Sequence, residues 1–328
     1  MPPRRETHWQ VPVPGSVAFG AAQAAVRRLA REPGLARACL GSPTRLSASY
    51  LQEGLSTAVF LLESEAGASS PAARFVVNVQ KRRGVRYRAH REFELLARHH
   101  ARRPDEVVRP LWHGWAGALP AYATQFYPAA AECNLWCSVL SGRFACTGYR
   151  LMVGGGASPF WRGYKTSYFG PEDQRLIARE TARLLAATYD PARGTAVRLR
   201  SEGFFSGDVL FLDDGEGRFR LKLVALRESV ATSLDGFLDA LIRLRVRSDD
   251  MPAAVPPFLN PESLAEGALA ALGRQALPGL KRRFAANRLT LAPAVWRRLA
   301  RPAARRGLRL SRPLSERPSL EAGSWTPL

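Results

Sequence analysis

The chain has 328 residues, of which 46% are hydrophobic and 23% are charged. This composition supports one large domain or two lobes and excludes wholesale disorder and fibrous repeats. A net charge of +20, from 48 Lys and Arg against 28 Asp and Glu, favours contact with phosphate-bearing partners. No apolar run is long enough to cross a bilayer, no secretory signal pattern is visible, and four cysteines are too few for a disulfide scaffold, so we expect a cytoplasmic protein.

The first part of the chain predicts a helical extension followed by a five-stranded lobe. Residues 1–43 form the extension, whose helix is expected to end at the Pro-Gly pair 33–34 and whose apolar stripe is Ala22, Val26 and Leu29. Residues 44–128 form the lobe, in which short apolar runs are bounded by glycine, proline and serine. One amphipathic helix is expected between its third and fourth strands, and the predicted ranges are 45–52, 55–63, 74–80, 86–101 (the helix), 107–113 and 119–127.

The rest of the chain is predicted to be mostly helical. Residues 129–280 form a second lobe and residues 281–328 a basic helical segment and tail. The strongest predicted helix begins at Pro171 and ends at Tyr189, and its buried stripe is Ile177, Thr181, Leu184 and Thr188. An acidic turn rich in glycine joins two later strands into a hairpin. The other predicted ranges are a short helix at 132–140, strands at 208–212 and 218–226, and helices at 233–245, 261–274 and 292–300.

Residues 50–60, Tyr-Leu-Gln-Glu-Gly-Leu-Ser-Thr-Ala-Val-Phe, contain a glycine turn between two predicted strands. The turn resembles the phosphate loop of choline kinases and aminoglycoside phosphotransferases. A small-residue turn lets backbone N–H groups approach a triphosphate without a Cβ clash. The resemblance implies that Gly54, Ser56 and Thr57 cover the phosphates. An ordinary hairpin with a glycine at its turn is the alternative.

Two further positions fit the same family. Lys81 ends the predicted strand 74–80, where kinases place a lysine that neutralises the phosphates and pairs with a glutamate of the next helix. Glu92 lies at the matching place in the helix 86–101. Gln125 and Tyr127 lie where these kinases join their two lobes and bind adenine through backbone groups. The alternative is that Lys81 begins a solvated basic loop and Glu92 pairs with an arginine.

The order of elements resembles an α+β, two-lobed protein-kinase-like fold, with a five-stranded antiparallel N-lobe and a mainly helical C-lobe. The resemblance is to the aminoglycoside phosphotransferase and choline kinase branch and extends over about residues 45–230. It implies an ATP-dependent phosphotransferase, with ATP and Mg²⁺ as cofactors. The acceptor, a small molecule or a protein, is not indicated by the sequence, and neither is the oligomeric state.

The catalytic loop departs from the family pattern. Active members carry an aspartate after the long second-lobe helix, usually preceded by a histidine, and a metal-binding asparagine five residues later. This chain has no histidine beyond His113. When the two are aligned on the following strand, Asp208 takes the place of the asparagine and Gly203 that of the aspartate. Ala225 stands where the second metal-binding acid is expected, and a methyl group cannot hold Mg²⁺.

Two interpretations of these departures stay open. In the first, the phosphotransfer machinery is lost and the protein is a pseudokinase that binds a nucleotide or a partner. In the second, Asp208 and Glu228 hold the metal in a shifted arrangement and Glu202 replaces the catalytic base. A carboxylate readily replaces an amide as a metal ligand.

The segment 281–328 is strongly basic, with twelve basic and two acidic residues. An amphipathic basic helix with a tryptophan fits an anionic surface, either lipid or nucleic-acid phosphates. The same helix can also cover the second lobe with its long arginine side chains extended to water. We expect residues 281–300 to have the packing role.

Overall fold

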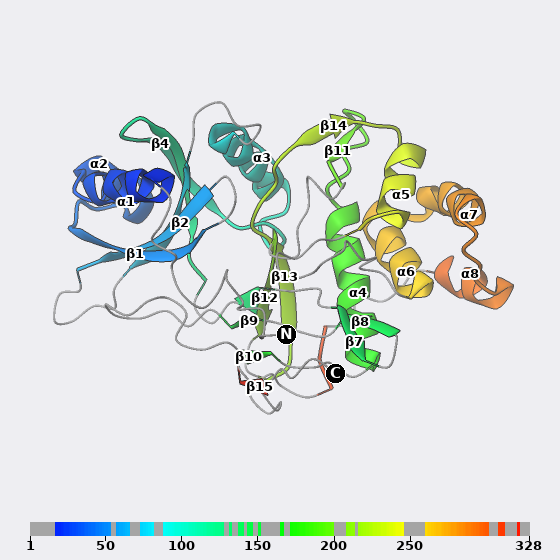
Figure 1. The fold of residues 1–328 in the computed structure, drawn as a ribbon. Coiled ribbons are helices and arrows are strands. Elements are labelled where there is room, and N and C mark those ends of the chain that lie inside the picture. The colour runs from blue at the N-terminus through cyan, green and yellow to red at the C-terminus, as the bar shows by residue number, and fades with distance from the viewer. Residues whose placement is uncertain are drawn as a thin grey trace. The chain divides into compact units, whose positions relative to one another are not determined.

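The computed structural model is a mixed α+β protein that divides into two compact units. Unit 1 comprises Met1–Ala129, Met152–Tyr164 and Ala322–Leu328, and unit 2 comprises Ala130–Leu151 and Lys165–Glu321. Figure 1 draws the elements of both. The structure describes residues 17–53, 57–65, 73–81, 88–127, 131–132, 137–140, 143–146, 150–151, 165–166, 171–199, 208–213, 216–245, 260–301, 308–311 and 320–321.

Unit 1 contains the predicted five-stranded antiparallel sheet. Its strand order is β1-β2-β3-β5-β4, so every pair of neighbours is antiparallel. The strands are β1 Leu46–Glu53, β2 Thr57–Ser64, β3 Arg74–Gln80, β4 Pro110–Ala116 and β5 Leu119–Gln125. The α+β class and this sheet are therefore confirmed. The two-lobed kinase-like arrangement and the boundaries 1–43, 44–128, 129–280 and 281–328 stay predictions.

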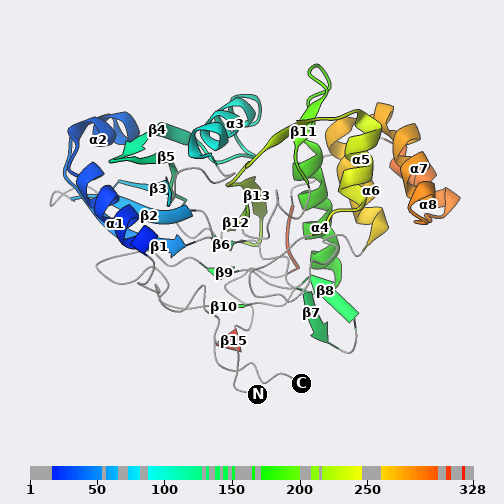
Figure 2. The same cartoon turned by 45° about the horizontal axis from the view of Figure 1, so that its top comes forward.

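Helices α1 (Val17–Leu29) and α2 (Pro33–Leu40) lie together on one face of this sheet (Figure 2). The buried stripe of α1 is the predicted one, and it packs on alternate residues of the central strands, namely Ala58, Phe60, Leu62, Phe75, Val77 and Val79. Pro33 was expected to end a helix but instead begins α2. Proline is tolerated there because the first helical N–H has no partner within the helix.

Helix α3 (Ala89–Arg102) packs on the opposite face of the sheet. Its Phe93 ring lies 4.5 Å from that of His113, and its His90 ring lies 5.2 Å from that of Trp115, measured between ring centroids. His113 and Trp115 alternate in β4 with Trp112, which packs toward α1 and α2. The sheet is thus covered on both faces.

Unit 2 contains five of the eight α-helices that the described residues form, together with one short 3₁₀ helix, Arg274–Ala276. The predicted stripe Ile177, Thr181, Leu184 and Thr188 is buried in α4. Asn260 caps α6 by accepting a hydrogen bond from the Glu262 N–H at 2.9 Å. The helices are α4 Pro171–Ala186, α5 Leu234–Ile242, α6 Pro261–Leu272, α7 Leu277–Ala286 and α8 Pro293–Leu299. No helix in the described ranges is long and apolar enough to span a membrane.

The strands of unit 2 are short. The predicted hairpin is confirmed as β12 (Val209–Asp213) and β13 (Phe219–Leu223), in a sheet of order β13-β12-β6-β9. The other strands are β6 Ala131–Glu132, β7 Cys137–Leu140, β8 Arg143–Cys146, β9 Arg150–Leu151, β10 Lys165–Thr166, β11 Thr195–Val197, β14 Ser229–Ala231 and β15 Leu320–Glu321.

The predicted helix at 132–140 is wrong, because β6 and β7 occupy both ends of that range. Strand β7 pairs antiparallel with β8, and Val139 lies opposite Phe144. A short apolar run satisfies either a helix or a strand pattern. Residues 137–140 form a strand because they pair with residues 143–146, only a few positions later.

Candidate functional site

The end of β3 and the first turn of α3 are joined by a buried hydrogen bond. The Ala89 N–H donates to Oε1 of Gln80 at 3.3 Å, and both residues are buried. Lys81 follows Gln80 directly and is half-buried, whereas Glu92 lies one turn further along α3 and is 1% exposed. The structure thus brings together the two segments that carry Lys81 and Glu92.

Alternation along β3 assigns its side chains to the two faces of the sheet. Val77 and Val79 face α1 and α2, so Asn78 and Gln80 face the α3 side. Lys81 lies beyond the strand, in a bend. Sequence reasoning missed Asn78 and Gln80, although two polar residues at alternate positions of an apolar strand were a signal for them.

Gln125 and Tyr127 are connected to the residues before β4. The Gln125 N–H donates to the Arg109 carbonyl at 2.8 Å. The Tyr127 hydroxyl accepts from the Arg109 N–H and donates to Oε1 of Gln125, both at 3.3 Å. Burial raises the pKa of Tyr127, so its hydroxyl stays protonated at neutral pH. The Gln125 N–H is already bonded, so an adenine here would have to use other backbone groups.

A small apolar cluster lies beside this segment, on the α3 side of the sheet. Phe126 and Leu61 are buried in it, and Val59 and Val76 are half-buried against them. The Arg74 guanidinium lies 6.0 Å from the centroid of the Phe126 ring. Such a surface can receive a flat apolar ring.

The two predicted metal ligands are each paired with an arginine in unit 2. Asp208 is 3% exposed, and Nη2 of Arg227 donates to its Oδ1 at 3.2 Å. The Glu228 side chain is 53% exposed, and its Oε2 lies 2.8 Å from Nε of Arg198. Both carboxylates therefore have a guanidinium as their counter-ion.

This donor set does not fit a Mg²⁺ centre. Magnesium requires several oxygen ligands in near-octahedral geometry, and here each candidate carboxylate already has a bound cation. No group of three or more His, Cys, Asp or Glu residues within the described ranges is arranged to hold a metal ion. Glu202, Gly54 and Ser56 lie outside those ranges, and Thr57 is the first residue of β2, opposite Gln80.

No protein-family model matches the sequence, and no curated protein is detectably similar to it. The assignment of a function therefore depends on the residue pattern and on the geometry described above.

Proposed function

We propose that this chain is a kinase-like pseudokinase that binds a nucleotide without Mg²⁺ and does not transfer phosphate. A five-stranded antiparallel sheet with one helix between its third and fourth strands is the N-lobe layout that the resemblance implies. The observation that carries the proposal is the pair formed by buried Asp208 and Arg227. The carboxylate expected to hold the metal is neutralised by a side chain of the protein itself.

The nucleotide site would be formed by the α3 side of the sheet in unit 1. The cluster around Leu61 and Phe126 offers an apolar surface for the adenine ring. Lys81 would supply a positive charge for the phosphates, as the family pattern implies. Glu92 is buried in the helix tied to the end of the same strand, where it can orient polar groups. Each of these features supports binding and none requires a metal.

Catalysis needs more than this set of residues provides. Phosphoryl transfer depends on metal ions that neutralise the developing charge and on a residue that orients the acceptor. Gly203 and Ala225 replace two of the acidic residues of the family pattern. Asp208, which stands in the place of the metal-binding asparagine, is bound to Arg227. We therefore expect no transfer of phosphate from a bound nucleotide to an acceptor.

Thermal shift measurements on the full chain test this function. We expect ATP to raise the melting temperature equally in EDTA and in excess Mg²⁺, because no metal site contributes to binding. Lys81→Met should reduce the shift, whereas Arg31→Met, which removes an exposed positive charge between α1 and α2, should leave it unchanged.

Two outcomes would contradict the proposal in different ways. If no nucleotide condition shifts the melting temperature, nucleotide binding is wrong. If Mg²⁺ enlarges the ATP shift and Asp208→Asn removes that gain, the metal-binding interpretation with Asp208 and Glu228 is supported instead.

A further inference from the structure

Helices α7 and α8 border a cavity that is widely open to solvent, and its volume of about 470 Å³ lies within the range of small-molecule pockets. The residues that line it are Lys281, Pro293, Trp296, Arg297 and Ala300. Trp296 is half-buried and is held from within by Phe284, whose ring centroid lies 5.3 Å away in an edge-to-face arrangement. The cavity therefore offers a fixed aromatic surface.

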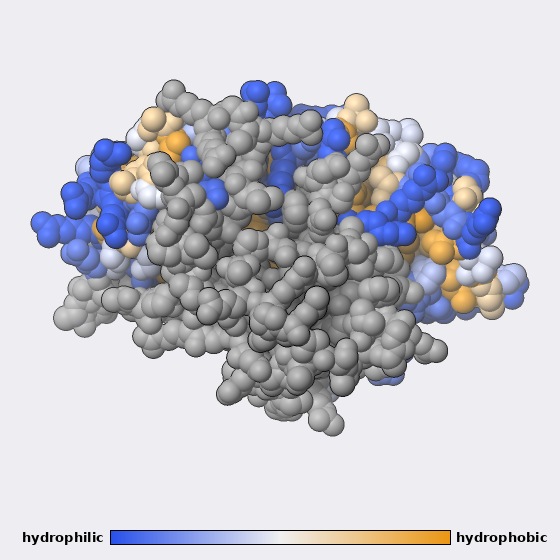
Figure 3. Space-filling model, in the orientation of Figure 1, coloured by the Kyte–Doolittle hydropathy of each residue, from blue (hydrophilic) through white to orange (hydrophobic). Residues whose placement is uncertain are grey.

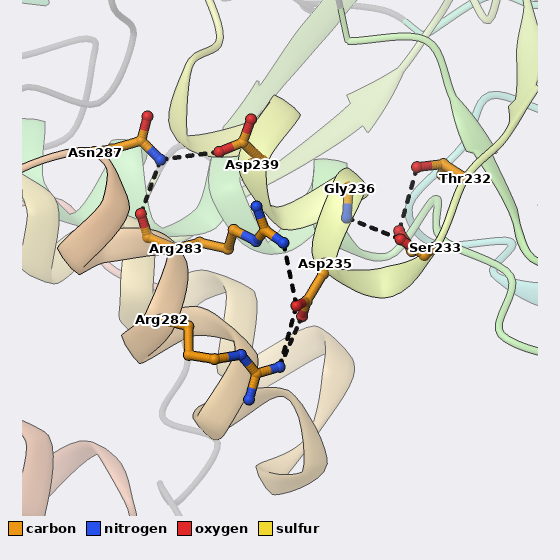
Figure 4. A network of polar contacts seen from close by, with 8 residues as sticks. All are labelled: Thr232, Ser233, Asp235, Gly236, Asp239, Arg282, Arg283 and Asn287. Atoms are coloured by element: carbon orange, nitrogen blue, oxygen red, sulfur yellow. Dashed lines mark hydrogen bonds and ion pairs between the residues drawn. The ribbon is translucent and has the colours of Figure 1, made fainter.

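Most cations beside this cavity already have acidic partners. Arg282 and Arg283 both donate to Asp235 (Figure 4), and Arg298 pairs with Glu262. These hydrogen bonds, first from Arg282 and then from Arg283, hold the pKa of Asp235 below its usual range, so the cluster stays ionised at neutral pH.

Lys281 and Arg297, which line the cavity, differ from these paired arginines. Within the described ranges neither has an acidic partner, and the Lys281 ammonium lies 5.7 Å from the centroid of the Trp296 ring. In Figure 3, hydrophilic and hydrophobic surface lie side by side where Figure 1 draws α7 and α8. Two uncompensated positive charges thus line the same cavity as an indole.

We infer that this cavity binds a small organic phosphate that carries an apolar ring. The phosphate would contact Lys281 and Arg297, because neither cation has an acidic partner among the described residues and phosphate is a strong acceptor. The ring would pack on Trp296, Pro293 and Ala300. The site lies in unit 2, so it is separate from the nucleotide site proposed for unit 1 and does not depend on it.

The shape of the site favours a small ligand over a lipid surface. Proteins that lie on membranes insert exposed apolar side chains into the lipid. No large apolar side chain is exposed on the described residues of α7 and α8, and Trp296 lines a hollow. A ligand can therefore pack against Trp296 here, whereas the described part of α7 and α8 presents no large apolar side chain to a bilayer.

Isothermal titration calorimetry with 1-naphthyl phosphate on the full chain tests the inference. We expect binding that is weakened about tenfold by Lys281→Gln and by Arg297→Gln, since each loses one charged contact. Arg274→Gln is the matched control, because Arg274 is an exposed cation of unit 2 that does not line the cavity. 1-Naphthol and inorganic phosphate, each holding half of the probe's chemistry, should bind more weakly than the whole probe.

The inference is overturned if the probe does not bind, or if both lining variants bind it like the unaltered chain. An equal loss in Arg274→Gln would also overturn it, since the effect would then come from overall charge. Sedimentation with phosphatidylserine vesicles separates the sources of phosphate. Capture by vesicles without binding of the soluble probe would replace the cavity with a lipid-binding surface. Circular dichroism of each variant confirms that the fold is intact.

Discussion

The two units bury different kinds of side chain. In unit 1 the described residues bury few polar side chains, namely Gln80, Glu92, His99 and Thr124. In unit 2 the described residues bury five ionisable groups of Asp, Glu and Lys, namely Asp173, Glu180, Asp190, Asp208 and Lys222. A buried charge is stable only with a partner. Among the described residues, unit 1 therefore needs few such partners, because Glu92 is its one buried carboxylate, whereas unit 2 needs several, some of them distant in the sequence.

The link between α4 and the C-terminal segment is an example. Asp173 accepts hydrogen bonds from the N–H and from the hydroxyl of Ser311, at 2.8 and 2.7 Å, across 138 positions. The Leu310 N–H donates to the Gly217 carbonyl at 2.8 Å, which extends the edge of β13. Part of the basic C-terminal segment is thus bonded to the fold of unit 2.

The largest effect is expected from breaking the buried ion pair. Arg227→Leu leaves Asp208 buried without its guanidinium partner, and we expect the free energy of unfolding to fall by about 2 to 3 kcal/mol. Arg198→Leu breaks the exposed pair with Glu228 and should cost less than about 1 kcal/mol. Urea unfolding measures both losses of free energy. If the two variants lose the same amount, the expected effect of burial on the ion pair is wrong.

The next effect concerns the contact between α4 and α6. A Cβ added at Gly267 would lie 2.2 Å from the Arg179 carbonyl oxygen, so Gly267→Ala should destabilise unit 2 by about 2 kcal/mol. The same substitution at Gly20 in α1 meets no atom within 4 Å. Gly20→Ala should stabilise the chain by up to about 1 kcal/mol, because alanine favours a helix. We expect Gly267→Ala to lower the melting temperature and Gly20→Ala to raise it. A lower melting temperature in Gly20→Ala would contradict this.

Ser311→Ala tests the C-terminal link. It removes the hydroxyl that donates to buried Asp173, and we expect a loss of about 1 kcal/mol in urea unfolding. Thr44→Ala removes an exposed hydroxyl that donates to the adjacent carbonyl and should have almost no effect. A silent Ser311→Ala would mean that Asp173 does not need this partner.

The smallest effect is expected at Asp235, which is half-buried and bonded to Arg282 and Arg283. Its pKa is lowered in the folded state, so its contribution to stability is complete above the usual pKa and is lost as the pH falls through the folded pKa. Asp235→Asn should lower the melting temperature slightly at pH 7, less so in high salt. The difference from the unaltered chain should disappear in strong acid, and a difference that grows there would contradict this.

Most of the described helices and strands of unit 1 were predicted, because the alternation and the periodicity that indicate them lie within short stretches of the sequence. Strand β3 has the predicted bounds, and β1, β2 and α3 begin and end within a few residues of them. Helix α2 was missed because a Pro-Gly pair indicates either the end or the start of a helix, and only the structure shows that Pro33 is a first-turn residue. In unit 2, α4 was predicted from its apolar period, but the strand pairing of 137–140 was not.

The candidate site was less accessible to sequence reasoning. The pairing of Arg227 with Asp208 joins residues 19 positions apart, and no periodicity indicates which arginine approaches which acid in a chain so rich in arginine. The hydrogen bond between Gln80 and Ala89 depends likewise on how α3 packs on the sheet. Residue type identified the candidates, and tertiary packing determined their partners.

The affinity for ATP measured by titration calorimetry, in EDTA and again in excess Mg²⁺, tests the central claim most directly. The chain should carry both Lys281→Gln and Arg297→Gln, so that the cavity of unit 2 does not contribute. Because Arg227 already neutralises Asp208, we predict the same dissociation constant in both conditions. An affinity at least about tenfold higher with Mg²⁺ would show that the metal enters the site and would contradict the account.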